Sequence, residues 1–163
     1  MTFVSCVITS FPDAHLNWTA DWLWGLPLIV ITVLIHVFGL GSIRHRTARF
    51  SSRSVERRHP TMAFVLVMGA TTLLASCLHA AEAALWAVAY RLLNALPDNK
   101  SAMLYSLDAI TSYGHTSLML QPHWNLMGAL EALNGWLLFG LTTAFMFGML
   151  ENVWKTDTSG GRR

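Results

Sequence analysis

Three long apolar stretches constrain the fold of this chain more than any other feature. They cover residues 22–43, which contain no Lys, Arg, Asp or Glu, residues 61–81, which are also charge-free, and most of residues 123–150. Each stretch is long enough to cross a hydrocarbon core, which takes about 20 helical residues. The 163 residues are only 12% charged, whereas soluble domains carry about 25%. The pattern predicts an all-α membrane protein with three transmembrane helices and no separate soluble domain.

The distribution of charge predicts the orientation of these helices. Residues 44–59 carry six arginines against one glutamate, a net charge of +5. Short loops rich in Lys and Arg lie on the cytoplasmic side, so we expect a basic cytoplasmic loop at 44–59 whose Arg44–Arg58 side chains bind anionic lipid headgroups. Residues 1–21 are then extracytoplasmic and residues 151–163 form a cytoplasmic tail. A loop this close to two spans does not favour a nucleic-acid partner.

The segment between the second and third spans is too short and too interrupted to form two further spans. Residues 97–99 read Pro-Asp-Asn, where Asp98 or Asn99 could cap a helix, and the apolar residues that follow end in Thr-Ser-Tyr-Gly-His. The pattern suits a half-helix that enters the bilayer and returns through an irregular loop. Such a loop is tolerated at membrane depth only where it is buried in protein or lines a watery cavity.

The residues of this segment carry a resemblance to a known family. Residues 105–114, YSLDAITSYG, resemble the pore helix and the start of the selectivity filter in potassium-channel-type pore-loop channels, and residues 128–147 are similar to the inner helix of bacterial two-span channels. The resemblance implies a pore module over residues 60–150. Within it, the outer helix covers 60–96, the pore helix 99–111, the filter 111–116 and the inner helix 123–150. The first span has no counterpart there and is expected to be peripheral.

The resemblance also implies a function and an assembly. One loop cannot enclose a pore, so we expect four copies around an axis in a bacterial inner membrane, with the N-terminus outside and the C-terminus cytoplasmic. Conduction of K⁺ or Na⁺ would be passive, without an enzymatic step or a cofactor. The implied filter residues are Thr111, Ser112, Tyr113, Gly114, His115 and Thr116, the pore-lining residues Trp136, Phe139 and Thr143, and the gating hinge Gly135.

The expected filter departs from the family pattern after Gly114. His115 stands at the place of the filter tyrosine and Thr116 at the place of the second glycine. Alternating glycines let backbone carbonyl groups point into the pore, so potassium selectivity does not follow from the resemblance. A less selective cation pathway and a non-conducting structural or assembly protein remain compatible with the sequence. His115 either lines the outer mouth, where it could sense pH, or faces outward at the headgroup level.

Three acidic residues within or beside the apolar segments are candidate supports of the filter. Asp108 precedes Ser112 by one helical turn, so it either braces the filter backbone or acts as a capping or solvated residue. Glu82 and Glu131 fall in or near spans, where an ionisable residue is costly and faces protein. Both are expected to hydrogen-bond a neighbouring helix or the pore loop, with a structural brace favoured over an ion site for Glu131.

Histidines in the apolar segments raise one further alternative, a haem or quinone oxidoreductase. Paired axial histidines on facing helices would be required for haem. The candidates are His36, His79 and His123. His36 is expected at mid-span and His79 towards the outer half of its span, and the sequence leaves open whether they share a depth. Satisfied or interfacial histidines are the favoured interpretation.

Overall fold

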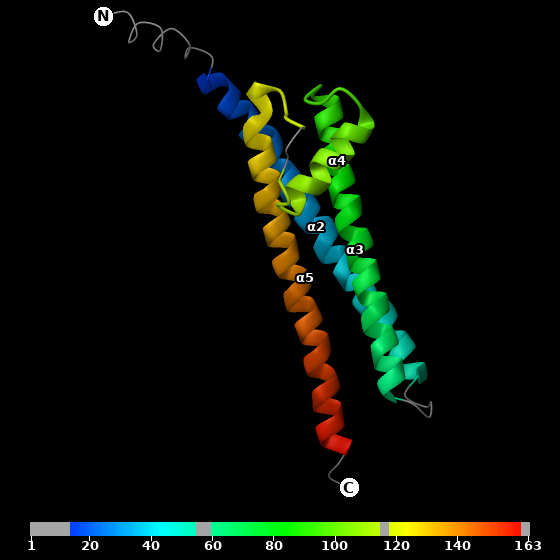
Figure 1. The fold of residues 1–163 in the computed structure, drawn as a ribbon. Helices are drawn as coiled ribbons and strands as arrows, with labels where there is room; N and C mark the ends of the chain where they lie inside the picture. Colours follow the sequence, from blue (N-terminus) through cyan, green and yellow to red (C-terminus); the bar gives the residue numbers. More distant parts are fainter. Residues whose placement is uncertain (1–13, 55–59, 115–117, 161–163) are drawn as a thin grey trace, which may run out of the picture. The chain divides into compact units, whose positions relative to one another are not determined.

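The computed structural model describes residues 14–54, 60–114 and 118–160, and over these residues every regular element is a helix (Figure 1). Three helices contain segments that are long and apolar enough to cross a membrane: Trp18–Thr47, Phe64–Leu92 and Pro122–Glu151. An all-helical chain with three helices that could span a membrane is thereby confirmed. The elements are α2 (Ala14–Ser54), α3 (Pro60–Leu92), α4 (Asn99–Ile110), the 3₁₀ helix η1 (Pro122–Trp124) and α5 (Asn125–Gly160).

Helix α2 extends beyond the predicted first span at both ends. Residues 44–54 continue the helix, so the prediction of a basic loop over 44–59 is wrong for this part, while residues 55–59 lie outside the described residues. The reason is that no Gly or Pro interrupts the chain between Gly41 and Ser54, and arginine is a good helix former. Hydropathy marks where a helix leaves the hydrocarbon core, which is not where the helix ends.

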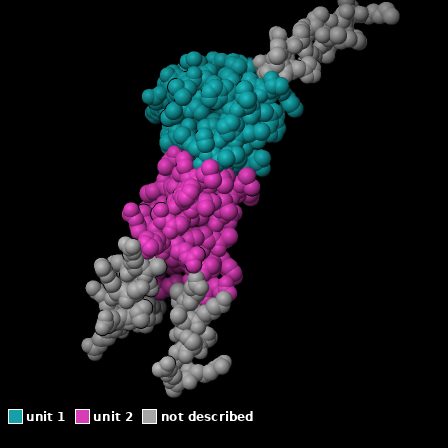
Figure 2. Space-filling model, turned by 180° about the vertical axis from the view of Figure 1, so that it is seen from behind, with its two compact units in different colours: residues 1–32, 82–135 teal, residues 33–81, 136–163 magenta. Residues whose placement is uncertain are grey.

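The chain forms two compact units (Figure 2). Unit 1 contains residues 1–32 and 82–135, and unit 2 contains residues 33–81 and 136–163. Parts of α2, α3 and α5 contribute to each unit, whereas α4 and the loop after it belong to unit 1 alone.

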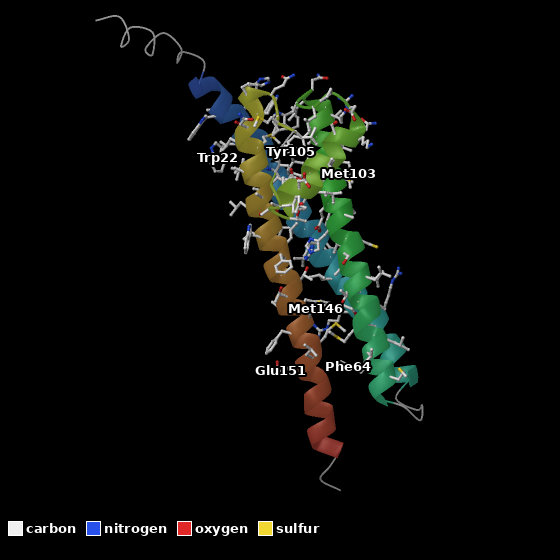
Figure 3. All side chains as sticks on the ribbon, in the orientation of Figure 1. Trp22, Phe64, Met103, Tyr105, Met146 and Glu151 are labelled. Carbon is white, nitrogen blue, oxygen red and sulfur yellow. The ribbon has the colours of Figure 1, made fainter. Side chains whose placement is uncertain are left out.

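The core of unit 1 lies around aromatic side chains. Trp86 and Tyr90 on α3 and Met127 on α5 are fully buried, and Tyr105 of α4 belongs to the same cluster. Figure 3 labels Tyr105 among the side chains of the chain. The rings of Tyr90 and Tyr105 meet edge to face with centroids 5.4 Å apart, a favoured aromatic geometry. Helix α4 is thus held by a packed core and not only by its connections to the chain.

Among the described residues of unit 2, the buried apolar side chains are Leu40, Ile43, Ala75 and Leu138. Helices α2 and α3 approach closely at Gly39, where a β-carbon would lie 2.6 Å from Leu78 Cδ2. Large apolar side chains such as Phe38, Leu73 and Phe147 are exposed. Exposed apolar side chains on helices of this length suit contact with lipid tails.

Candidate functional site

The chain makes a closed excursion between α3 and α5, and this excursion forms the candidate site. Helix α3 ends at Leu92, and α4 begins at Asn99 after a turn. The backbone N–H of Gln121, just before η1, donates to the Ala95 carbonyl oxygen at 3.3 Å. The chain therefore leaves the end of α3, runs through α4 and a loop, and returns to its starting point.

The turn into α4 is held by charged and polar side chains. The Arg91 guanidinium donates to the Leu96 carbonyl oxygen at 2.6 Å and to Asn99 Oδ1 at 2.9 Å. Asp98 caps α4, because its carboxylate accepts from the backbone N–H of Ser101 at 2.9 Å and from the Ser101 hydroxyl at 2.7 Å. The predicted cap is thereby confirmed at Asp98, and the helix begins at Asn99.

Helix α4 reaches far down the side of α5. A β-carbon at Gly128 would meet the Tyr105 hydroxyl, and one at Gly135 would meet the carbonyl oxygen of Ile110 at the end of α4. At 1.5 Å per residue, about 15 Å of helix separates Asn125 from Gly135. That is about half of a hydrocarbon core of about 30 Å. Gly135, predicted as a gating hinge, is thus also a close-packing residue.

The chain forms a hydrogen-bonded turn where α4 ends. The N–H of Ser112 donates to the Ala109 carbonyl oxygen and the N–H of Tyr113 to that of Asp108, each at 2.9 Å. Ser112 has φ of 55° and Gly114 has φ of +92°. A positive φ is readily adopted by glycine, which gives Gly114 a backbone role.

The predicted filter residues that the structure describes are exposed in the single chain. Thr111, Ser112, Tyr113 and Gly114 are all exposed, and Tyr113 retains 85% of its accessible surface. His115 and Thr116 lie outside the described residues. An irregular, exposed backbone beside the level of Gly135 is compatible with a membrane only if protein or water covers it.

A buried polar network ties α4 to its neighbours. The Tyr90 hydroxyl donates to Glu131 Oε2 at 2.6 Å, and the Ser106 hydroxyl contacts both Glu131 Oε1 and the Ala83 carbonyl oxygen. Glu131 and Ser106 are fully buried. The network joins α3, α4 and α5, as the interpretation of Glu131 as a brace requires.

The hydrogens available in this network are compatible with a neutral Glu131. The Ser106 hydroxyl lies 2.6 Å from the Ala83 carbonyl oxygen, and this close approach requires the only hydrogen that the hydroxyl has. The contact between Ser106 and Glu131 then needs a hydrogen from the carboxyl group. The arrangement is complete when Glu131 is neutral, accepting from Tyr90 and donating to Ser106.

Helix α2 contacts α5 directly in unit 1. Asn134 Nδ2 on α5 donates to Thr32 Oγ1 on α2 at 2.8 Å, and Thr32 donates to the Leu28 carbonyl oxygen at 2.8 Å. A β-carbon at Gly25 would meet Leu130. Glycine and small polar residues thus let α2 approach α5 closely. The expectation that the first span is peripheral to a pore stays a prediction, because this contact does not show where a pore axis lies.

The other predicted site residues differ in how deeply their side chains are buried. Glu82 is buried and Asp108 is half-buried. Trp136 and Phe139, 67% and 65% exposed, share an exposed side of α5 with Thr143. Their exposure in one chain suits a pore lining and a lipid-facing surface equally well.

The three histidines considered as haem ligands divide into a close pair and a separate residue. The His36 and His79 rings lie 5.0 Å apart in unit 2, and each ring contacts the hydroxyl of Thr142. The question of a shared depth is thus answered for this pair. His123 is exposed in η1, beside Trp124.

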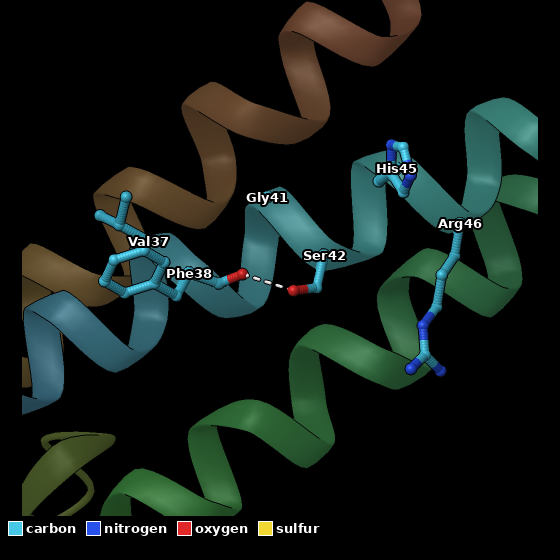
Figure 4. Close-up of a pocket in the computed structure, with 6 residues that line it drawn as sticks. All are labelled: Val37, Phe38, Gly41, Ser42, His45 and Arg46. Carbon is cyan, nitrogen blue, oxygen red and sulfur yellow. Dashed lines mark hydrogen bonds between the residues drawn. The ribbon is translucent and has the colours of Figure 1, made fainter.

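The surface of α2 near its basic segment has a shallow depression (Figure 4). One end of the depression is apolar and the other is polar and basic. The exposed Arg44 lies on the same stretch of helix. The residues that line the depression are Val37, Phe38, Gly41, Ser42, His45 and Arg46.

Sequence reasoning missed several residues of these networks. Tyr90, Ser106 and Asn134 were not identified, nor was Thr142. A usable signal exists on α5, where Glu131, Asn134 and Thr142 are polar residues at helical spacing in an otherwise apolar run. No protein-family model, curated protein or solved structure matches this chain.

Proposed function

We propose that this chain is one subunit of a passive cation channel, in which four copies surround a pore and residues 111–116 form its narrowest part. The observation that carries the proposal is the excursion from Ala95 to Gln121. It begins and ends at one level and delivers the end of α4 beside Gly135. On the proposed arrangement, α4 is a re-entrant pore helix and the loop after it is the filter.

The exposure of residues 111–114 supports an oligomer around this loop. Backbone groups at membrane depth need hydrogen-bond partners from protein or water. Four loops around a closed axis would supply both, since each loop covers the next and the centre holds water and ions. Carbonyl and hydroxyl oxygens of the loop would then replace part of the hydration shell of the ion.

The polar network around Glu131 also supports the proposal, because it fixes the position of α4. A pore helix must hold its position while ions pass, and α4 is anchored by Tyr105 packing and by Ser106 hydrogen bonds. Further along α5, Trp136, Phe139 and Thr143 would line the inner cavity. Permeant cations are K⁺ or Na⁺, because the altered residues His115 and Thr116 do not favour a strictly potassium-selective filter.

Ion flux into liposomes that contain the purified chain tests the proposal. We expect flux of at least one monovalent cation, and we expect Gly114→Val to abolish it because valine resists the positive φ at this position. Gly69→Val is the matched control, since nothing lies within 4 Å of a β-carbon there. Elution as a tetramer verifies that each variant is assembled.

Three outcomes would contradict the proposal. Absence of flux for every monovalent cation from a tetrameric wild type would favour the non-conducting structural protein. Unchanged flux in Gly114→Val would place the pore elsewhere. A monomeric wild type would also contradict the proposal, because a single loop cannot enclose a pore.

A further inference from the structure

Unit 2 contains a polar cluster inside its three helices, remote in sequence from the proposed filter. His36 comes from α2, His79 from α3 and Thr142 from α5. His36 Nε2 lies 2.9 Å and His79 Nε2 3.1 Å from Thr142 Oγ1. His36 and Thr142 are buried, and His79 is half-buried.

Packing alone does not account for this cluster. An ionisable side chain within a membrane-spanning segment is costly and marks a functional site more often than not. Two imidazole rings from different helices meet around one oxygen, where leucine side chains would fill the space without desolvating polar atoms.

We propose that His36, His79 and Thr142 bind a divalent transition-metal ion of the Zn²⁺ type. Neutral imidazole nitrogen is a preferred ligand of Zn²⁺, Cu²⁺ and Ni²⁺. The metal would join α2 to α3 through the two histidines, with the threonine oxygen as a third ligand and water in the remaining position. The proposal does not depend on the channel function.

The distances fit the ligand set. Zinc–nitrogen bonds of about 2.0–2.1 Å in a tetrahedral site place neighbouring ligand atoms about 3.3 Å apart. The two distances to Thr142 Oγ1 are 2.9 and 3.1 Å, and a ring nitrogen of His36 lies within 4.8 Å of one of His79. Coordination would lengthen the two contacts to Thr142 Oγ1 by a few tenths of an ångström, and it would turn the His36 and His79 rings so that their nitrogens face a common ion.

The same geometry disfavours haem at this place. Bis-histidine ligation requires a porphyrin ring between the two imidazoles. Here the ring centroids are only 5.0 Å apart and the Thr142 hydroxyl contacts both rings. The space between the histidines suits an ion and not a macrocycle.

A direct metal titration tests the proposal on the full chain. The protein is purified in detergent, freed of any affinity tag and treated with a chelator. Co²⁺ is then titrated while its visible absorption is recorded, and Zn²⁺ is added as a competitor. We expect saturation at one equivalent per chain, displacement by Zn²⁺ and a higher thermal unfolding midpoint in the presence of Zn²⁺.

Variants locate the metal. His36→Gln and His79→Gln are each expected to weaken binding by at least about 100-fold, more than the loss of an outer-shell partner causes. Thr142→Val retains both imidazoles and is expected to weaken binding by about tenfold. His45→Gln and His123→Gln are matched controls, because both residues are exposed outside the cluster, and they should bind as the wild type does.

The rival explanation is a hydrogen-bonded chain without a ligand, in which Thr142 donates to one histidine and accepts from the other. No saturable binding by the wild type up to about 1 mM metal would establish that rival and overturn the proposal. Equal binding by the wild type, His36→Gln and His79→Gln would overturn it as well. One histidine variant could be misfolded, in which case its metal-free form would elute differently from the metal-free wild type. Metal binding by the other histidine variant and by Thr142→Val then tests the proposal.

Discussion

The carbonyl oxygen of Ile110, at the end of α4, occupies the place that a β-carbon would take at Gly135 on α5. This contact sets how far α4 descends along α5. It also explains the glycine without reference to gating, because any larger residue would push the end of α4 away. The position of the candidate filter therefore depends on the absence of a side chain.

Replacing Gly135 by alanine tests this contact. We expect a loss of about 1–3 kcal/mol in the free energy of unfolding, the usual cost of overpacking a tight interior contact. A denaturant titration in mixed micelles measures it. Gly140→Ala is the matched control on the same helix, where a β-carbon would have nothing within 4 Å. Equal stability of the two variants would contradict the close approach.

The hydrogen count at Glu131 predicts a difference between two substitutions. Glu131→Gln keeps an acceptor for Tyr90 and a donor for Ser106, so we expect stability within about 1 kcal/mol of the wild type. Glu131→Ala leaves both hydroxyl groups without this partner and should cost about 1–3 kcal/mol or more. The same denaturant titration separates them. A glutamine variant as unstable as the alanine variant would mean that the network requires a carboxylate.

The hydrogen bond between Asn134 and Thr32 predicts an energetic coupling between these two residues, and thus between α2 and α5. In a double-mutant cycle of Asn134→Ala and Thr32→Val, we expect an interaction energy of about 0.6 kcal/mol, the average for such bonds in membrane helices. Thr72→Val is the control, since the Thr72 hydroxyl donates to Met68 of its own helix. Strict additivity of the first pair would show that α2 does not hold α5 through this bond.

The cap of α4 predicts a dependence of stability on pH. The Ser101 backbone N–H, helped by the Ser101 hydroxyl, holds the pKa of Asp98 below its ordinary value of 3.8. A carboxyl whose pKa is lowered by folding contributes stability that is present above its unfolded pKa and is lost as pH falls through the folded pKa. Acidification below about pH 4 should therefore lower the unfolding midpoint.

Two variants separate charge from capping at this residue. Asp98→Asn can still accept a hydrogen bond at the helix start, so it should keep most of the stability at neutral pH but show a weaker acid dependence. Asp98→Ala should lose both the stability that the cap provides at neutral pH and the acid dependence. Thermal unfolding followed from neutral pH to about pH 3 measures the difference. Identical pH profiles for Asp98→Asn and the wild type would assign the acid dependence to other groups.

The sequence by itself determined the elements that rest on local composition. Long apolar runs predict the three long helices because the hydrocarbon core leaves backbone groups no other partner than their own helix. The Pro-Asp-Asn turn predicts the start of α4 because capping acts within a few residues. The sequence did not predict the length of α2. A run of arginines marks where a span leaves the hydrocarbon core, but arginine is also a good helix former, so the helix continues into water.

Only the tertiary structure decided which residues meet. Glu131 joins Tyr90 and Ser106, and His36 joins His79, across long separations in sequence. Helical periodicity gives the face on which a residue lies, but the meeting of two faces depends on the axial offset between helices. Close approach at glycines such as Gly135 sets that offset. The reach of α4 and the contact of the first span with α5 therefore became visible only in the folded chain.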